Sequence, residues 1–281
     1  MSLYLRAAIG LVPWYGRPKD LPDTTLTRRT TVDRKRLADY NRVCGFRLAD
    51  TLPPTYPHIL AFPLAMRLMS ASSFPFPAVG LVHVGNRIEL RRPIDAAEPL
   101  DLAVRAADLR PHDRGRQFDV IATASVEGEE VWRGVSTYLR RESSRPSDSS
   151  GPSAGGRGDR AAPAPPAASA RWRVEPRVGT DYARVSGDHN PIHTSRLGAR
   201  LFGFARPIAH GMWSKARCLA ALEGRLPDAY TVDVAFKLPI FLPSTVAFST
   251  TAALPEWSFA LHHARSAKPH LTGAITPIPS S

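Results

Sequence analysis

The chain has 281 residues, of which 43% are hydrophobic and 22% are charged, enough apolar material for one large or two small domains with real cores. It contains no run of about 18 uncharged apolar residues, so we expect no membrane span. The formal net charge is +12, but the arginines are scattered and no nucleic-acid-binding motif accompanies them, so nucleic acid is not an expected partner.

The amino-terminal segment and the two cysteines both favour a cytoplasmic protein. Residues 3–14 are mildly apolar, but a charge, a glycine and a proline interrupt them and no small-residue cleavage site follows, so we expect no signal peptide. Cys44 and Cys218 lack the spacing of a metal site. We expect two buried thiols in a reducing cytoplasm, with a disulfide between them as the alternative.

The first half of the chain is predicted to form one long helix, at residues 59–70, followed by four strands. The strands are rich in valine, isoleucine and aromatic residues. They are expected at residues 81–90, 100–109, 116–126 and 131–139.

Residues 143–170 are dominated by serine, glycine, proline and alanine. Such a segment buries too little apolar surface to offset its ordering entropy, so we predict a flexible linker. It divides the chain into a first domain at residues 1–142 and a second domain at residues 171–281.

The second half repeats the pattern of one helix followed by four strands. Residues 211–223 place apolar side chains near helical spacing, and Gly224 and Pro227 end that helix. One central helix with an antiparallel sheet that curls around it gives an α+β fold in each half. The strands are expected at residues 231–237, 245–253, 257–262 and 271–276.

Two sequence segments occur in both halves, in the same order and at nearly the same offset. Residues 39–46 (Asp-Tyr-Asn-Arg-Val-Cys-Gly-Phe) parallel residues 181–188 (Asp-Tyr-Ala-Arg-Val-Ser-Gly-Asp). Residues 90–94 (Leu-Arg-Arg-Pro-Ile) parallel residues 236–240 (Phe-Lys-Leu-Pro-Ile). We infer an internal duplication, with chance similarity of short stretches as the alternative.

A candidate acid/base pair follows the duplicated segment of the second half. Asp188 precedes His193 by five residues, with a Gly-Asp-x-Asn-Pro turn between them. Two groups of differing pKa that share one water can take up and deliver a proton. We expect Asp188 to raise the pKa of His193 and to favour its protonated form. Taken alone, Asp188 would be read as a residue that stabilises an Asx-turn, and His193 as a histidine at a helix start whose hydrogen bonds are satisfied. Together, within so long a motif, the two residues favour a catalytic role.

Asn190 and Gly211 complete the candidate site. Asn190 hydrogen-bonds either a reacting group or its own turn, and the sequence leaves both open, whereas Pro191 only fixes the turn. Gly211 opens the second predicted helix, where a backbone N–H can stabilise developing negative charge as an oxyanion hole does. The alternative is a plain helix-terminal glycine. We expect His210 to be structural.

The sequence indicates no metal, covalent or redox chemistry. The other histidines lack ligand spacing with carboxylates or cysteines, so we expect no metal site. No serine or cysteine lies in a nucleophile motif, and neither a Walker A nor a dinucleotide motif occurs, so no cofactor is expected.

The motif Tyr182-x-x-Val-Ser-Gly-Asp-x-Asn-Pro-Ile-His193, followed by Gly203-Phe-x-x-Pro-Ile-x-His-Gly211, resembles the signature of the MaoC-like, hydratase-2 family of (R)-specific enoyl thioester hydratases. The resemblance implies a hot-dog fold in each half, with the two units forming a pseudo-dimer within one chain. It also implies that Asp188 and His193 activate water, that Gly211 donates to the thioester oxygen and that Asn190 lies at the site.

The first half departs from this motif. It has Phe46 at the position of Asp188, and five residues later it has Thr51 instead of histidine, which leaves one site per chain. In relatives with a degenerate first unit, that unit gives room to long or bulky acyl groups. The side chains that could line such a space, or could simply form the core, are Tyr56, Ile59, Phe62, Leu64 and Met69.

The function that the resemblance implies is reversible hydration of (2E)-enoyl thioesters to (R)-3-hydroxyacyl thioesters in fatty acid metabolism. Asp188 would take the proton from water and His193 would protonate Cα, or the reverse. The acyl chain would be carried by coenzyme A or acyl carrier protein, whose negative charge suits this basic chain. A second copy of the chain is a further candidate partner. The alternative functions are a hot-dog acyl thioesterase and a non-catalytic acyl-thioester binding partner.

Overall fold

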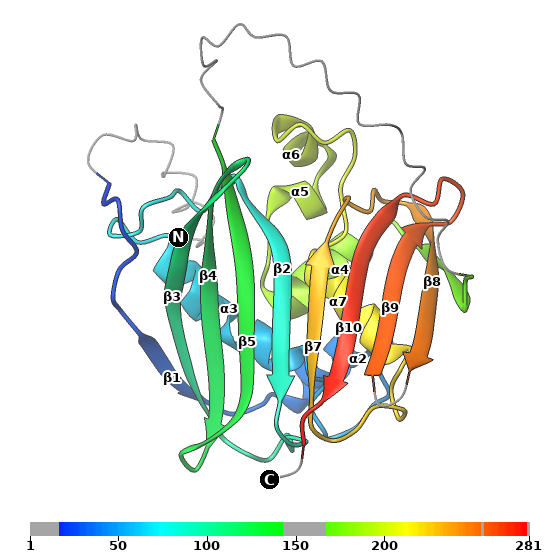
Figure 1. Cartoon of the computed structure of the whole chain (residues 1–281), viewed down its shortest axis with the longest axis horizontal. Coiled ribbons are helices and arrows are strands. Elements are labelled where there is room, and N and C mark those ends of the chain that lie inside the picture. The colour runs from blue at the N-terminus through cyan, green and yellow to red at the C-terminus, as the bar shows by residue number, and fades with distance from the viewer. Residues whose placement is uncertain (1–16, 143–166, 254–255, 280–281) are drawn as a thin grey trace, which may run out of the picture.

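The computed structural model describes residues 17–142, 167–253 and 256–279, and their strands form one ten-stranded antiparallel sheet (Figure 1). The strand order is β1-β3-β4-β5-β2-β7-β10-β9-β8-β6, so each half supplies five neighbouring strands. The strands are β1 (Leu26–Thr30), β2 (Leu81–Leu90), β3 (Leu100–His112), β4 (Gly115–Val126), β5 (Glu129–Arg141), β6 (Ala170–Val174), β7 (Tyr230–Phe236), β8 (Ser244–Ala253), β9 (Glu256–His263) and β10 (Pro269–Pro277).

In the first half, α3 (Tyr56–Met69) covers one face of the sheet, whereas α2 (Arg34–Cys44) packs against helices of the second half (Figure 1). α2 begins where the Asp33 carboxylate accepts the Arg36 N–H at 3.0 Å, and it ends at Gly45, whose φ of 83° suits glycine. α3 packs on β3 and β4, and each aliphatic side chain that it fully buries contributes about 1.5–3 kcal/mol. These side chains include Ile59, Leu60, Leu64 and Leu68.

The second half contains counterparts of both helices and two additional short ones. α4 (Val178–Ser186) matches α2, because it ends at Gly187 with φ 83° just as α2 ends at Gly45. α7 (Gly211–Ala220) matches α3. Between them lie α5 (Pro191–Thr194) and α6 (Arg196–Leu201), at the top of Figure 1. A helix enclosed by antiparallel strands in each half is the predicted α+β arrangement of two hot-dog units.

Equivalent hydrogen bonds outside the helices confirm the internal duplication. In the first half the N–H of Leu52 donates to the carbonyl of Ile94 at 2.9 Å. In the second half the N–H of Ala209 donates to the carbonyl of Ile240 at 2.9 Å. Both bonds join the segment before the main helix to the Pro-Ile pair after the first long strand, β2 or β7. Leu52 and Ala209 are therefore counterparts.

The halves join where residues 85–90 of β2 pair with residues 230–235 of β7. Behind this seam lies the fully buried Lys215 of α7. Its Nζ donates to the main-chain oxygen of Asn86 at 2.9 Å, to the Asn86 Oδ1 at 2.6 Å and to the main-chain oxygen of Val232 at 3.1 Å. Three acceptors match the three donors of an ammonium group, although burial lowers the pKa of Lys215 well below its ordinary value. α7 is thus fixed to both halves.

The predicted strands and helices are present, with small shifts at their ends, but the helices α2, α4, α5 and α6 were not predicted. The first helix starts at Tyr56 rather than residue 59, and the second ends at Ala220 because residues 221–223 form turns. The edge strands β1 and β6 were not predicted. Residues 143–166 of the predicted linker lie outside the described residues, but β6 already begins at Ala170, the predicted last linker residue, because Trp172 stacks on Phe248 of β8.

Two expectations from composition can be compared with the described residues. Within them, no helix has the length and apolar character needed to cross a bilayer. Cys44 and Cys218 are both free and buried, so the disulfide alternative is wrong. Burial raises the pKa of both thiols, which keeps them protonated and unreactive.

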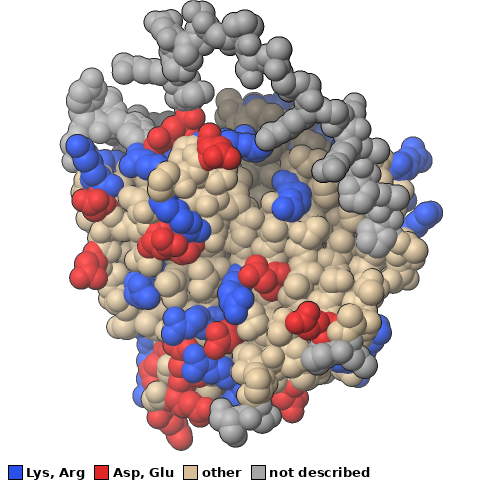
Figure 2. Space-filling view, viewed as in Figure 1, with Lys and Arg blue, Asp and Glu red and all other residues tan. Residues whose placement is uncertain are grey.

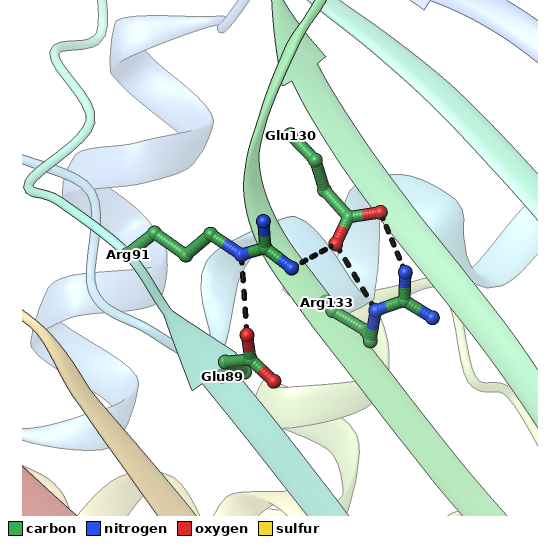
Figure 3. A network of polar contacts seen from close by, with 4 residues as sticks. All are labelled: Glu89, Arg91, Glu130 and Arg133. Atoms are coloured by element: carbon green, nitrogen blue, oxygen red, sulfur yellow. Dashed lines mark hydrogen bonds and ion pairs between the residues drawn. The ribbon is translucent and has the colours of Figure 1, made fainter. Parts of the chain in front are cut away.

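Charged side chains of both signs gather at the lower ends of β4 and β5, whereas the sheet face over β9 and β10 carries few (Figure 2). One network there links the end of β2 to β5 (Figure 3). Glu130 accepts from Arg91 at 2.8 Å and from Arg133 at 2.9 Å, and Glu89 accepts from Arg91 at 3.1 Å. Such partly exposed pairs contribute little each, about 0–1 kcal/mol. The network therefore orients the hairpin more than it stabilises the fold.

Candidate active site

The loop between α4 and α5 is built by consecutive local hydrogen bonds. The Ser186 hydroxyl accepts the N–H of Asp188 at 3.1 Å, and the Asp188 carboxylate accepts the N–H of Asn190 at 3.2 Å. The Asn190 side chain in turn accepts the N–H of Ile192 at 3.3 Å and so caps α5. Asn190 thus hydrogen-bonds within its own turn, which is the local one of the two roles that the sequence left open. Its contact with a substrate stays a prediction.

His193 is buried, and one of its ring nitrogens is already committed. Its Nδ1 lies 2.8 Å from the main-chain oxygen of Ile208. A carbonyl oxygen only accepts, so in the neutral ring Nδ1 carries the proton and Nε2 carries the lone pair. Burial lowers the pKa of His193, and the Asp188 charge opposes this without reversing it. The predicted increase in pKa is therefore wrong, because desolvation outweighs the carboxylate. Neutral His193 is a proton acceptor at Nε2.

His210 contacts both members of the predicted pair, so describing it as merely structural was incomplete. Its ring stacks on that of His193 with centroids 3.7 Å apart. Its Nε2 donates to the main-chain oxygen of Asp188 at 3.0 Å and lies 3.8 Å from the carboxylate. Burial and then the neighbouring His193 lower the pKa of His210 to about 3, so it stays neutral. His210 therefore positions Asp188. In the sequence, the only indication of this role is that His210 directly precedes Gly211.

The three side chains form one cluster. One carboxylate oxygen of Asp188 and one nitrogen of each of His193 and His210 lie within 4.8 Å of one another. A carboxylate with two imidazoles is also a donor set for Zn²⁺. However, the Nε2 of His210, which faces Asp188, donates to a carbonyl and has no lone pair for a metal ion. The geometry favours proton transfer, and the absence of a metal stays a prediction.

Gly211 opens α7 beside this cluster. It directly follows His210, whose φ of −65° and ψ of 138° are extended, and it is the first residue of the helix. The N–H groups of a first helical turn have no intrahelical acceptor, so that of Gly211 can donate to a ligand. A Cβ at this position would lie 3.1 Å from the Phe236 ring, so glycine keeps the approach open. The oxyanion role stays a prediction that this placement supports.

In its described residues, the first half has no counterpart of this site. Phe46, at the position of Asp188, is buried and stacks on Tyr40 with ring centroids 6.4 Å apart. Thr51 is exposed and bridges Asp95, in the same way that Ile208 bridges Phe241. Thr51 therefore does not occupy the position that corresponds to His193. The structural counterpart of Thr51 is Ile208. The first half lacks the whole segment that forms α5 and α6.

The first half nevertheless sends side chains toward the site. The ring of His83 stacks on Tyr138 at 4.8 Å and lies 5.0 Å from Phe236, whose ring faces Gly211. Burial and then the Asp188 charge raise the pKa of Tyr138. Burial lowers the pKa of His83 to about 3. A continuous series of rings thus runs from Gly211 into the first half, which residue spacing alone did not reveal.

Of the five side chains considered for an acyl space, Phe62 alone is half-exposed. The other four pack in the core of the first half and are at most 7% exposed: Tyr56, Ile59, Leu64 and Met69. Ordinary core packing describes those four.

Comparison with known proteins agrees with the fold and the motif. Residues 161–257 match the model of the MaoC like domain. The chain is 37% identical to 3-hydroxyacyl-thioester dehydratase X of Mycobacterium tuberculosis, over 96% of this chain and 95% of the relative. It is 27% identical to the peroxisomal enoyl-CoA hydratase 2 of Arabidopsis thaliana, over 60% of this chain and 57% of that protein.

Among solved structures, HtdX of Mycobacterium tuberculosis superposes with a TM-score of 0.79 at 34% identity, covering 91% of this chain and all of that one. The similarity extends over both halves rather than over the motif alone. The chain belongs to the MaoC-like dehydratase family, with a double hot-dog architecture.

Proposed function

We propose that this chain is a hydro-lyase that reversibly hydrates (2E)-enoyl thioesters to (R)-3-hydroxyacyl thioesters in fatty acid metabolism. The observation that carries the proposal is the cluster of Asp188, His193 and His210, in which His193 is held neutral with its Nε2 lone pair available. Membership of the MaoC-like dehydratase family supports the reaction class.

The protonation state of His193 suggests how the proton moves. A water held between Asp188 and His193 transfers a proton to the His193 Nε2 while its oxygen bonds to Cβ. The π electrons move through Cα to the thioester oxygen. The imidazolium, which Asp188 stabilises, then returns the proton to Cα. His193 thus serves first as the base and then as the acid, so it does not have to be protonated before the reaction starts. This differs from the first expectation, in which Asp188 takes the proton from water.

Gly211 stabilises the negative charge of the intermediate. The enolate oxygen accepts a hydrogen bond from the Gly211 N–H at the start of α7, where the helix dipole also favours negative charge. Removing one such donor typically slows catalysis about 10²–10³-fold. The Phe236 ring against Gly211 keeps this position apolar, which strengthens the hydrogen bond.

The test is hydration by the purified full-length chain of an enoyl-CoA series, followed as loss of the absorbance of the conjugated thioester. We expect turnover, a product of (R) configuration on chiral analysis, and no release of free thiol. Release of thiol without hydration would instead identify a thioesterase. Binding of enoyl-CoA without either reaction would identify a non-catalytic partner.

Three further properties belong to this proposal. Activity needs no metal or redox cofactor, so it should survive dialysis against a chelator. The chain works in the cytoplasm, where its buried thiols stay reduced. Each chain already contains a pair of hot-dog units, so the site is complete without a second copy. A homodimer of double hot-dog chains stays a prediction for light scattering.

A further inference from the structure

The segment that the second half has in addition carries an unbalanced charge. Between Asp188 and Glu223 the sequence contains no acidic residue, yet it includes the exposed arginines Arg196, Arg200 and Arg206. In the part of the chain that the structure describes, no ion pair involves any of these three, although many other arginines are paired. Unpaired positive charge beside an active site attracts acidic ligands and accelerates their association.

The helix α6 sets two kinds of side chain next to each other. Arg196 and Arg200 are four residues apart and so share one face of the helix, and Leu197 and Leu201 share the adjacent face. Leu197 is 70% exposed, Leu201 is 77% exposed and Phe202, which follows them, is 44% exposed. These five residues form the α6 surface. They include three of the six large apolar side chains that the described residues expose.

The α6 surface is held rigidly beside the candidate site. The Ser195 hydroxyl accepts the N–H of Gly198 at 3.2 Å and caps α6. Gly198 packs so closely on Pro191 that a Cβ there would lie 2.4 Å from the proline ring. Pro191 opens α5, the helix that carries His193. A molecule bound to α6 therefore sits one short helix away from the reacting groups.

We propose that the α6 surface is the docking site of an acidic acyl carrier protein that presents the enoyl thioester to Asp188 and His193; this rests on the proposed function. Carboxylates of the carrier would pair with Arg196 and Arg200 at the edge of the contact. Apolar side chains of the carrier would cover Leu197, Leu201 and Phe202 at its centre. Coenzyme A offers phosphates for the arginines but, in its adenine ring and pantetheine arm, less apolar surface than a protein contact, so the mixed character of α6 favours a protein.

The test compares carrier-linked with CoA-linked enoyl substrate of the same chain length, using the full-length chain. In the double variant Arg196→Glu/Arg200→Glu, kcat/KM for the carrier-linked substrate should fall about ten-fold or more, because reversed charge slows association. The kcat/KM of the same variant for the CoA-linked substrate should change less than about two-fold. The variant Leu197→Ser/Leu201→Ser should show the same selectivity. Added salt should slow the unchanged protein on the carrier-linked substrate in particular.

The matched control is Arg28→Glu/Arg105→Glu, the same charge change at exposed positions of β1 and β3 in the first half. It should leave both substrates unaffected. Equal losses on both substrates in the α6 variants, or no loss on either, would overturn the docking proposal. A second copy of the chain as the occupant would overturn it too, and would appear as a dimer that the α6 variants dissociate. Failure of the proposed function is distinct, since the unchanged protein would then hydrate neither substrate.

Discussion

The connection between the two matched helices of each half, α2 and α3 or α4 and α7, distinguishes the half with the candidate active site from the half without it. In the first half it runs directly from Phe46 to Leu52. In the second half the equivalent connection runs from Asp188 to Ala209 and forms α5 and α6 on the way. The sheets and main helices around both connections are alike. In the proposed function, the groups that activate water therefore lie in one added segment and in the carboxylate before it, whereas Gly211 lies on a helix that both halves share.

The sharpest test of this difference is Asp188→Asn. It removes the carboxylate that stabilises protonated His193, so we expect kcat/KM for enoyl-CoA hydration to fall about 10³-fold. Asp181→Asn, the same change on α4 where Asp181 pairs with Arg177 and Arg184, serves as the control and should stay within about two-fold. An Asp188→Asn variant with more than a third of the original activity would place the chemistry elsewhere.

Restoring the missing groups to the first half should fail. Phe46→Asp removes a buried ring stacked on Tyr40, so we expect the free energy of unfolding to fall by about 3–5 kcal/mol in urea titration. Thr51→His lies on the surface and should cost less than about 0.5 kcal/mol. The double variant should gain no activity, since Thr51 matches Ile208 rather than His193. A second set of active sites in that variant would show that the added segment is dispensable.

Lys215→Met tests whether the halves depend on each other. The change leaves the Asn86 oxygens and the Val232 carbonyl without their donor, so we expect a loss of about 3 kcal/mol in urea titration. If Lys215→Met unfolds like the unchanged protein, the seam is held by strand pairing alone.

The pH dependence of stability should come from histidines of both halves. Burial lowers the pKa of His83 to about 3 and that of His210 to about 3, whereas an unfolded histidine titrates near 6.5. Below pH 6.5 the unfolded chain therefore binds protons that the folded chain excludes, and stability falls as the pH drops toward 4. His83→Phe should reduce the loss between pH 7 and 5 by about 2 kcal/mol. An unchanged or steeper loss would contradict a neutral buried His83.

Most elements and the core of the site were predictable because alternation and helical spacing record which faces are buried. The strands β1 and β6 were not, since each is a five-residue edge strand with exposed arginines on it. The role of His210 depends on a chain reversal that brings Ile208 back to Ile192, which no local pattern encodes. The pKa shift of His193 was predicted with the wrong sign because its desolvation depends on residues far away in the sequence.

The buried amine of Lys215 bears on the symmetry of the two halves. It binds close to the middle of the β2–β7 pairing, where a two-fold axis would run if the halves were identical separate molecules. In such an assembly a lysine at this place would meet its own symmetry mate, and two ammonium groups in a dry interior repel strongly. A single lysine at the axis is compatible only with unequal partners. Lys215 thus marks the place where the two halves of the chain differ most plainly from a symmetric pair.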